Sequence, residues 1–242
     1  MNQGLHVRKG RWGFPVALLV LTVLFVALGV WQVRRLAWKE ALIAKVEKRV
    51  DAPPVAVPDG DAAQGQALRD REYLRVHTTG DYVRSGTALV RAVTDLGSGY
   101  WVLTPLRVKD GRLIYINRGF VPVGSRLGSV QQATPSGPVA VTGLVRLTEP
   151  GGGFLRANDP AGDHWYSRDV TALAASRGLT HVAPFFIDAQ ELTPAPPAAG
   201  PVPGLTVVRF PNNHLSYALT WFAMAILSFG LALWMRRRHD MR

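Results

Sequence analysis

The segment YWVLTPLRVKDGRLIYINRGF, residues 100–120, decides the fold of the middle of the chain. Its two halves, 100–108 and 112–120, are rich in β-branched and aromatic residues, a composition typical of β-strands. Between them stands Lys109-Asp110-Gly111, a short connection whose glycine can take the positive φ that tight hairpin turns require. The segment therefore predicts two antiparallel strands joined by a hairpin turn.

The same pattern recurs on both sides of this hairpin. Further strands are predicted at 72–83, 87–93, 139–147 and 183–190. Residues 168–178 predict a short helix, with Asp169 near its start and Gly178 as its stop. The proline-containing segments 51–66 and 191–204 are interpreted as loops. The fold expected for the middle region is a β-rich, antiparallel α+β domain.

Two apolar segments near the ends of the chain are long enough to cross a membrane as α-helices. WGFPVALLVLTVLFVALGVWQV, residues 12–33, carries no charge, and a spanning helix needs about 20 apolar residues. The second segment is 210–235. A cleaved signal peptide is the alternative for the first, because Ala27-Leu28-Gly29 offers a small-x-small cleavage site. An uncleaved helix is favoured, because the apolar run exceeds that of a typical signal peptide and a basic stretch follows it.

The net charge of +11 is concentrated beside these two segments. Residues 1–50 hold nine Lys and Arg against two acidic residues, and residues 210–242 hold four against one. The middle, 51–209, holds fifteen against fourteen. A nucleic-acid-binding face needs a basic stripe on the folded part of the chain, so the nearly neutral middle argues against nucleic acid as a partner.

These charges also predict a topology. The run Arg236-Arg237-Arg238 after the second segment is a cytoplasmic anchor under the positive-inside rule. The expected organisation is cytoplasmic for 1–11 and 236–242, transmembrane for 12–33 and 210–235, and periplasmic for 34–209. A bacterial inner membrane is expected, because the stretch before the first segment is too short for a Ser-rich transit peptide.

The middle region offers no constellation typical of an enzyme. The chain has no cysteine, which excludes disulfides, thiol nucleophiles and Cys-ligated metals. It contains no G-x-S-x-G, no H-E-x-x-H and no phosphate-binding glycine loop. His164, Ser167 and Asp169 stand close together in one loop, where a catalytic triad is not expected. We expect no enzymatic activity and interpret this loop as a polar cap of the following helix.

Arg118 allows two interpretations. It stands in NRGFVP, residues 117–122, where a charge, a glycine and a proline follow an apolar strand. In the first interpretation the strand ends here with a bulge. In the second, Arg118 leaves the edge of the sheet and binds an anion such as a carboxylate with its planar guanidinium.

Several segments, in the same order along the chain, resemble the Surfeit-locus cytochrome oxidase biogenesis family of assembly factors. They are LGVWQVRRLAWKEALI (28–43), EYLRVHTTGDY (72–82), 99–122, APFF (183–186) and PNNHLSYALTWF (211–222). The resemblance implies a bacterial, two-span membrane protein that assists the assembly of haem–copper terminal (cytochrome c) oxidase. It also implies that haem a is bound through a histidine of the second span and inserted into the catalytic subunit, with haem a synthase as a further partner. The alternative is a membrane scaffold that stabilises an oxidase subunit without binding haem.

His214 is the histidine to which this resemblance points. In a helix it shares one face with Tyr217, Trp221 and small residues at 218, 225, 228 and 232, against which another helix can pack closely. Gly29 of the first segment is expected at a similar depth, and Phe222 is expected to face lipid.

Two interpretations of His214 stay open. In one, His214, Asn212 and Asn213 cap the helix, and Tyr217 and Trp221 belong to an aromatic belt at the surface of the lipid bilayer. In the other, which the resemblance favours, His214 is the metal ligand of haem iron and Tyr217 and Trp221 are flat walls for the macrocycle. Cationic candidates for its propionates are Arg118, Arg34, Arg35 and Arg209.

Overall fold

The computed structural model describes residues 13–153, 155–205 and 211–240. The chain divides into two compact units, of which one is Val46–Val208 and the other combines the segments 1–45 and 209–242. We call the first the β-domain and describe the second through its two helices, α1 and α5, as the helix pair. Trp12 and Arg209, which entered the sequence interpretation, lie outside the described residues.

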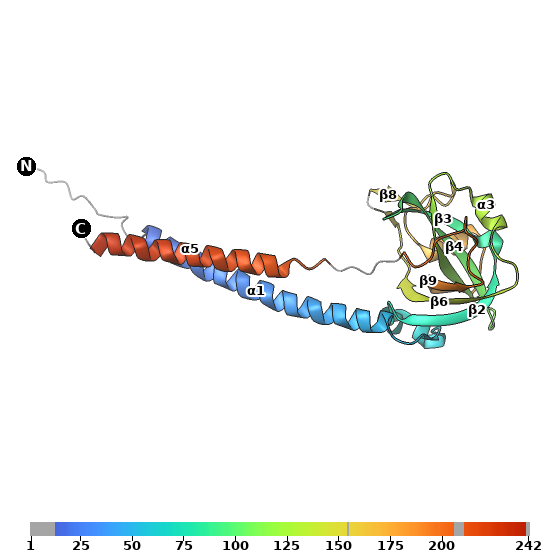
Figure 1. The fold of residues 1–242 in the computed structure, drawn as a ribbon, viewed down its shortest axis with the longest axis horizontal. Helices are drawn as coiled ribbons and strands as arrows, with labels where there is room; N and C mark the ends of the chain where they lie inside the picture. The colour runs from blue at the N-terminus through green and yellow to red at the C-terminus, as the bar shows by residue number, and fades with distance from the viewer. Residues whose placement is uncertain (1–12, 154, 206–210, 241–242) are drawn as a thin grey trace, which may run out of the picture. The chain divides into compact units, whose positions relative to one another are not determined.

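The helix pair consists of α1, Gly13–Val50, and α5, His214–Asp240, which lie side by side (Figure 1). Both are long and apolar enough to cross a membrane, with mean hydropathies of 2.6 and 1.8 over their most apolar windows. This confirms the predicted pair of apolar helices flanking a β-rich domain. At 1.5 Å per residue α1 is about 57 Å long, so it continues well past the apolar segment that ends at Val33.

The facing sides of the two helices follow a repeat of alternately three and four residues. The buried and half-buried positions of this seam are Pro15, Leu18, Thr22, Phe25, Gly29 and Gln32 on α1, and His214, Ala218, Trp221, Ala225, Ser228 and Ala232 on α5. Such a spacing is the heptad pattern of a left-handed helix pair. The small residues predicted to form one face of the second span are therefore the residues that face α1.

Close approach and one hydroxyl pair hold the seam together. A Cβ added to Gly29 would lie only 2.6 Å from Cε1 of Phe222, so the ring occupies the space that the glycine leaves free. Phe222 was expected to face lipid. That expectation is wrong, because its ring covers Gly29. Farther along, the hydroxyl groups of Thr22 and Ser228 lie 2.9 Å apart, which joins two polar side chains in an otherwise apolar contact.

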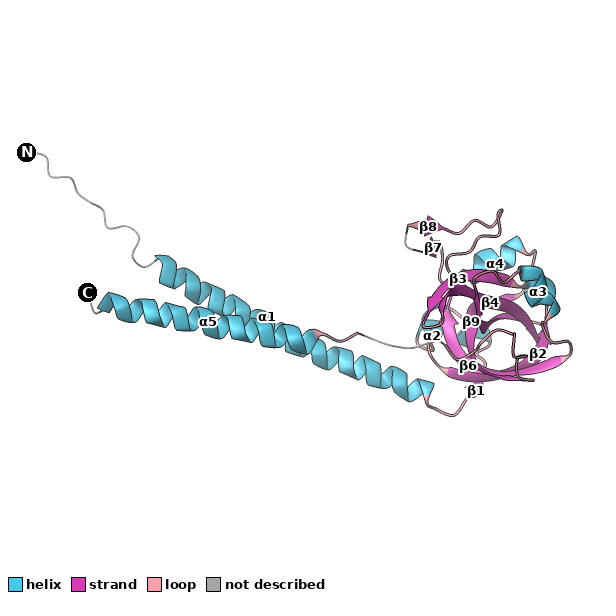
Figure 2. Cartoon of the chain, turned by 45° about the horizontal axis from the view of Figure 1, so that its top comes forward, coloured by secondary structure: helices cyan, strands magenta, loops and turns pink. Residues whose placement is uncertain are grey.

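The β-domain is a closed barrel with attached strands (Figure 2). Its sheet runs β1-β2-β6-β9-β5-β4-β3, and an additional pairing of β2 with β4 closes the five strands from β2 to β4. The strands are β1 Val55–Ala56, β2 Arg75–Tyr82, β3 Ala88–Thr94, β4 Gly97–Val108, β5 Leu113–Pro122, β6 Pro138–Leu147 and β9 Val182–Thr193. Most neighbours are antiparallel, as predicted, but β1–β2 and β5–β9 are parallel pairs that the sequence interpretation did not contain.

Short helices and one small hairpin complete the β-domain. They are the 3₁₀ segments η1 Gly60–Ala63 and η2 Arg84–Gly86, the helices α2 Gly65–Arg69, α3 Leu127–Gln132 and α4 Val170–Ser176, and the pair β7 Gly152–Gly153 and β8 Arg156–Ala157. The predicted helix at 168–178 is confirmed as α4. Its N-cap is Asp169, whose side chain accepts a hydrogen bond from the backbone N–H of Ala172, and Gly178 follows it with a φ of 62°.

The six predicted strands are confirmed as β2, β3, β4, β5, β6 and β9. Gly111 has the positive φ expected of the hairpin turn, 85°. The barrel interior is filled by aliphatic side chains from all five strands, and a second buried cluster around Trp165 lies beneath α4. The interpretation of 51–66 as only a loop was incomplete, because it contains β1, η1 and the start of α2.

Candidate functional site around His214

His214 begins α5 and forms a hydrogen bond across the helix pair. Its Nδ1 lies 2.7 Å from Oε1 of Gln32, which is only 8% exposed. An amide oxygen can only accept, so Nδ1 carries the hydrogen and donates it. In the neutral ring the other nitrogen, Nε2, then keeps its lone pair. Nε2 has no hydrogen bond to any residue in the described part of the chain.

The structure brings Trp221 into the seam with His214 but leaves Tyr217 outside it. Trp221 stacks on Phe25 of α1, with ring centroids 5.8 Å apart and an interplanar angle of 25°. Tyr217 is 55% exposed, because the repeat of three and four residues passes from His214 to Ala218 and Trp221. Of the two predicted aromatic walls, one is therefore packed against α1 and the other is open to the surroundings of the helix pair.

The side chain of Asn212 does not cap α5 as predicted. Oδ1 of Asn212 is buried and has no hydrogen-bond partner among the described residues, so it accepts no backbone N–H of the first helical turn. The Asn212 part of the capping interpretation is therefore wrong. Nζ of Lys39 donates a hydrogen bond to the carbonyl oxygen of Pro211. This contact joins the segment before α5 to α1.

The cations suggested for propionates lie in different places. The guanidinium of Arg35 lies over the ring of Trp38, 4.1 Å from its centroid, on the exposed surface of α1. Arg34 is also exposed on α1. Arg118 belongs to the β-domain.

Arg118 is buried inside the β-domain rather than displayed at an edge. It is 2% exposed, its Nη1 donates to Oγ1 of Thr134 over 2.6 Å, and its guanidinium lies 5.1 Å from the ring centre of Tyr82. β5 pairs with both β4 and β9, so Arg118 does not leave a sheet edge, and that interpretation is wrong in its geometry.

The bulge interpretation describes Arg118 better. The register with β4 shifts so that Arg118 and Gly119 together oppose Val102, and Gly119 has a φ of 121°. The strand nevertheless continues to Pro122. Burial lowers the pKa of Arg118, and burial raises the pKa of the neighbouring Tyr82 to about 12.

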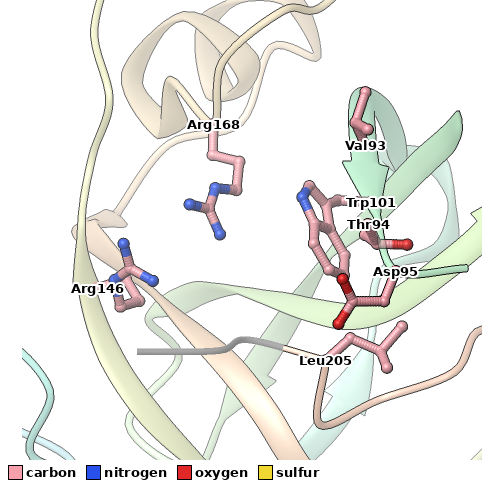
Figure 3. Close-up of a pocket in the computed structure, with 7 residues that line it drawn as sticks. All are labelled: Val93, Thr94, Asp95, Trp101, Arg146, Arg168 and Leu205. Carbon is pink, nitrogen blue, oxygen red and sulfur yellow. The ribbon is translucent and has the colours of Figure 1, made fainter. Parts of the chain in front are cut away.

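A pocket of the β-domain with about 380 Å³ is lined by two arginines and an indole (Figure 3). The guanidinium groups of Arg146 and Arg168 point into it, and the ring of Trp101 lies on the other side. Sequence reasoning missed these arginines, because their shared partner Asp188 comes from a distant, apolar strand segment.

The two cations of this pocket are already neutralised within the protein. Asp188, 1% exposed, accepts hydrogen bonds from Nη1 of Arg146 at 2.9 Å and from Nη1 of Arg168 at 3.2 Å. Glu149 accepts from Nη2 of Arg168 at 2.6 Å. Burial would lower the pKa of Arg168, but these two carboxylates outweigh it and raise it. With Asp95 also lining the space, the pocket has no excess positive charge for an anionic ligand.

The polar loop around His164 is confirmed as a structural feature and not a triad. Nδ1 of His164 lies 3.6 Å from Oδ2 of Asp159, while Ser167 donates its hydroxyl hydrogen to the carbonyl oxygen of Glu149. Asp169 caps α4. Within the described residues, no group of three His, Asp or Glu side chains is placed to hold a metal ion.

The comparisons with known proteins agree with the resemblance seen in the sequence. Residues 19–226 match the model of the SURF1 family. Surfeit locus protein 1 of Mus musculus is 37% identical over 86% of this chain and 70% of its own length, and that of Homo sapiens is 35% identical over 86% and 72%. A SURF1-like protein of Monosiga brevicollis is 35% identical over 95% of this chain and 90% of its own length. This chain therefore belongs to the SURF1 family.

Proposed function

We propose that this protein assists the assembly of cytochrome c oxidase by holding haem a through Nε2 of His214 and delivering it to the catalytic subunit. The SURF1 family is a family of cytochrome oxidase assembly factors, which supplies the general role. The observation that carries the specific proposal is the hydrogen bond between His214 and Gln32, which occupies Nδ1 and leaves Nε2 available. Haem a is the cargo in this scheme.

The residues at this level of the helix pair fit an axial ligand. Haem iron binds a ring nitrogen that carries a lone pair, and the hydrogen bond from Nδ1 to Gln32 leaves Nε2 as the nitrogen for that role. The exposed ring of Tyr217 stands one turn below His214 and offers an apolar face to a flat macrocycle. His214 would hold the cargo through a single side chain, which suits a protein that hands its cargo to a recipient.

The proposed topology places both chain ends in the cytoplasm and the β-domain on the periplasmic side of a bacterial inner membrane. It is supported by the two apolar helices and by the basic residues that follow the second one. Haem a synthase is the proposed donor and the oxidase catalytic subunit the recipient. A reporter active only in the cytoplasm, fused after Arg242, should be active, and the same reporter inserted in the exposed turn at Asp95-Leu96 should be inactive.

Bound haem measured on purified variants tests the ligand. The full chain is expressed in a host that makes haem a, and the haem is extracted and typed. The wild type should carry haem a, and His214→Ala should lose most of it. His77→Ala is the matched control, because His77 is an exposed histidine of β2 and should leave haem content unchanged. Equal haem in wild type and His214→Ala removes His214 from the ligand role.

The second candidate is a membrane scaffold that binds no haem. The hydrogen bond between His214 and Gln32 also fits this role. A hydrogen bond between His214 and Gln32 can also serve only to join two helices in an apolar environment. In that case purification would recover the oxidase subunit without haem absorbance. The expected result for haem delivery is recovery of both.

A further inference from the structure

We propose that Gln32 is the positioning residue of this site: it fixes the tautomer and the ring orientation of His214 so that Nε2 faces the ligand. This inference rests on the proposed function for the identity of the ligand. The donor–acceptor pair itself stands on the observed contact between Nδ1 and Oε1, at 2.7 Å.

Gln32 is held in place by the seam around it. It occupies a buried position of the α1 repeat, one step after Gly29, where α1 meets the ring of Phe222. The stacked pair of Phe25 and Trp221 fixes the same two helices two steps away. A side chain at a buried seam position next to two such contacts has little rotational freedom, so its amide oxygen is presented to His214 in one direction.

The consequence for the imidazole follows from its own geometry. Nδ1 and Nε2 lie on different edges of the ring, so a hydrogen bond from Nδ1 toward α1 directs the lone pair of Nε2 away from Gln32. Partners of this kind, which hold the second nitrogen of a metal-binding histidine, fix its tautomer and tune its basicity.

A neutral amide suits a ligand that must be released. A carboxylate at this position would draw the Nδ1 hydrogen more strongly and make the ring a more basic, tighter ligand. A carboxylate would also be costly to bury beside the apolar seam. An amide orients the ring without adding charge, which matches a site that gives up its cargo.

The test combines a measurement without haem and two with it, on the full chain in detergent. Without haem, ¹⁵N spectra of histidine-labelled protein should show His214, assigned by its loss in His214→Ala, as the Nδ1–H tautomer. Gln32→Leu should shift this signal to a mixture of tautomers. Gln32→Glu restores an acceptor and should keep the Nδ1–H signal.

With haem, Gln32→Leu should lower the affinity by about 10- to 100-fold. Gln32→Glu should lower the midpoint potential of the bound haem and slow its release, because a more basic ligand favours ferric iron. Thr22→Val is the matched control: it removes the other polar contact of the seam, to Ser228, without touching His214, and should change neither signal nor affinity.

Two results would overturn the inference: an unchanged tautomer in Gln32→Leu, or losses of affinity in Gln32→Leu and Thr22→Val that are equal. Failure of the wild type to bind haem would instead refute the proposed function, and the tautomer measurement would still decide whether Gln32 positions His214.

Discussion

Asp188 of the β-domain and His214 of the helix pair differ in how many of their polar atoms have partners. In the β-domain, Asp188 is surrounded by donors from Asn117, Arg146 and Arg168, and both of its oxygens are used. In the helix pair, His214 is held at one ring nitrogen by Gln32, and the other nitrogen has no partner among the described residues. A buried carboxylate with both oxygens paired serves the fold, whereas a half-used side chain at a defined place is where a ligand can bind. The difference directs attention to His214 rather than to the pocket beside Arg146 and Arg168.

The largest expected effect comes from removing Asp188. Asp188→Ala leaves two part-buried guanidinium groups without their shared buried carboxylate, which should cost about 3–5 kcal/mol of unfolding free energy. Chemical denaturation of the full chain, monitored by near-UV circular dichroism of its packed aromatic side chains, measures this loss.

Asp110→Ala is the control, because its ion pair with Arg112 is exposed and should contribute about 0–1 kcal/mol. Equal losses in the two variants would mean that the Asp188 network does not hold the β-domain together.

The next effect concerns the seam of the helix pair. Gly29→Ala places a Cβ 2.6 Å from the ring of Phe222, so the ring or the helices must shift, at a cost of about 1–3 kcal/mol. The shift should also lengthen the contact between Gln32 and His214 and reduce haem content. Titration with a denaturing detergent in mixed micelles separates the helices, and the midpoint of this separation reports the stability of the helix pair.

Gly230→Ala provides the comparison, since a Cβ at that glycine of α5 meets no atom within 4 Å. An unchanged Gly29→Ala protein would show that the helices do not pack as closely as the seam requires.

The smallest expected effect is an increase in the stability of the β-domain. The hydroxyl of Tyr82 is buried without a hydrogen-bond partner among the described residues, so Tyr82→Phe should raise stability by about 1 kcal/mol while keeping the ring against Arg118. Tyr115→Phe should instead lose about 1 kcal/mol, because that hydroxyl donates to the carbonyl oxygen of Gly86.

Tyr82 also predicts a pH dependence with a definite sign. Burial raises its pKa in the folded state from 10.0 to about 12. Above pH 10 the unfolded chain therefore ionises first, and stability should fall between pH 10 and pH 12. Tyr82→Phe should reduce this loss, which thermal unfolding at pH 9, 10 and 11 measures. A slope identical to that of the wild type would contradict the assignment to Tyr82.

The strands could be predicted from the sequence because each carries its own pattern, as the hairpin around Gly111 shows. The closure of β2 on β4 could not, because only the register of strands distant in the chain determines it. His214 could be found because a histidine at the head of an apolar segment is conspicuous. Gln32 was missed, although it is one of few polar side chains in residues 12–33, because its partner lies 182 residues away. The hydrogen-bond partners of Asp188 could not be predicted for the same reason, because they also lie far away in the sequence.

The separation of Gln32 from His214 along the chain also bears on the order of synthesis. α1 emerges first, and its buried positions Thr22, Gly29 and Gln32 have no helix to face until the whole β-domain has been made. α5 then brings Ser228 and His214 to them. The proposed haem ligand and the closing of the seam thus arrive together, so a nascent chain has no complete site before its second helix is in place.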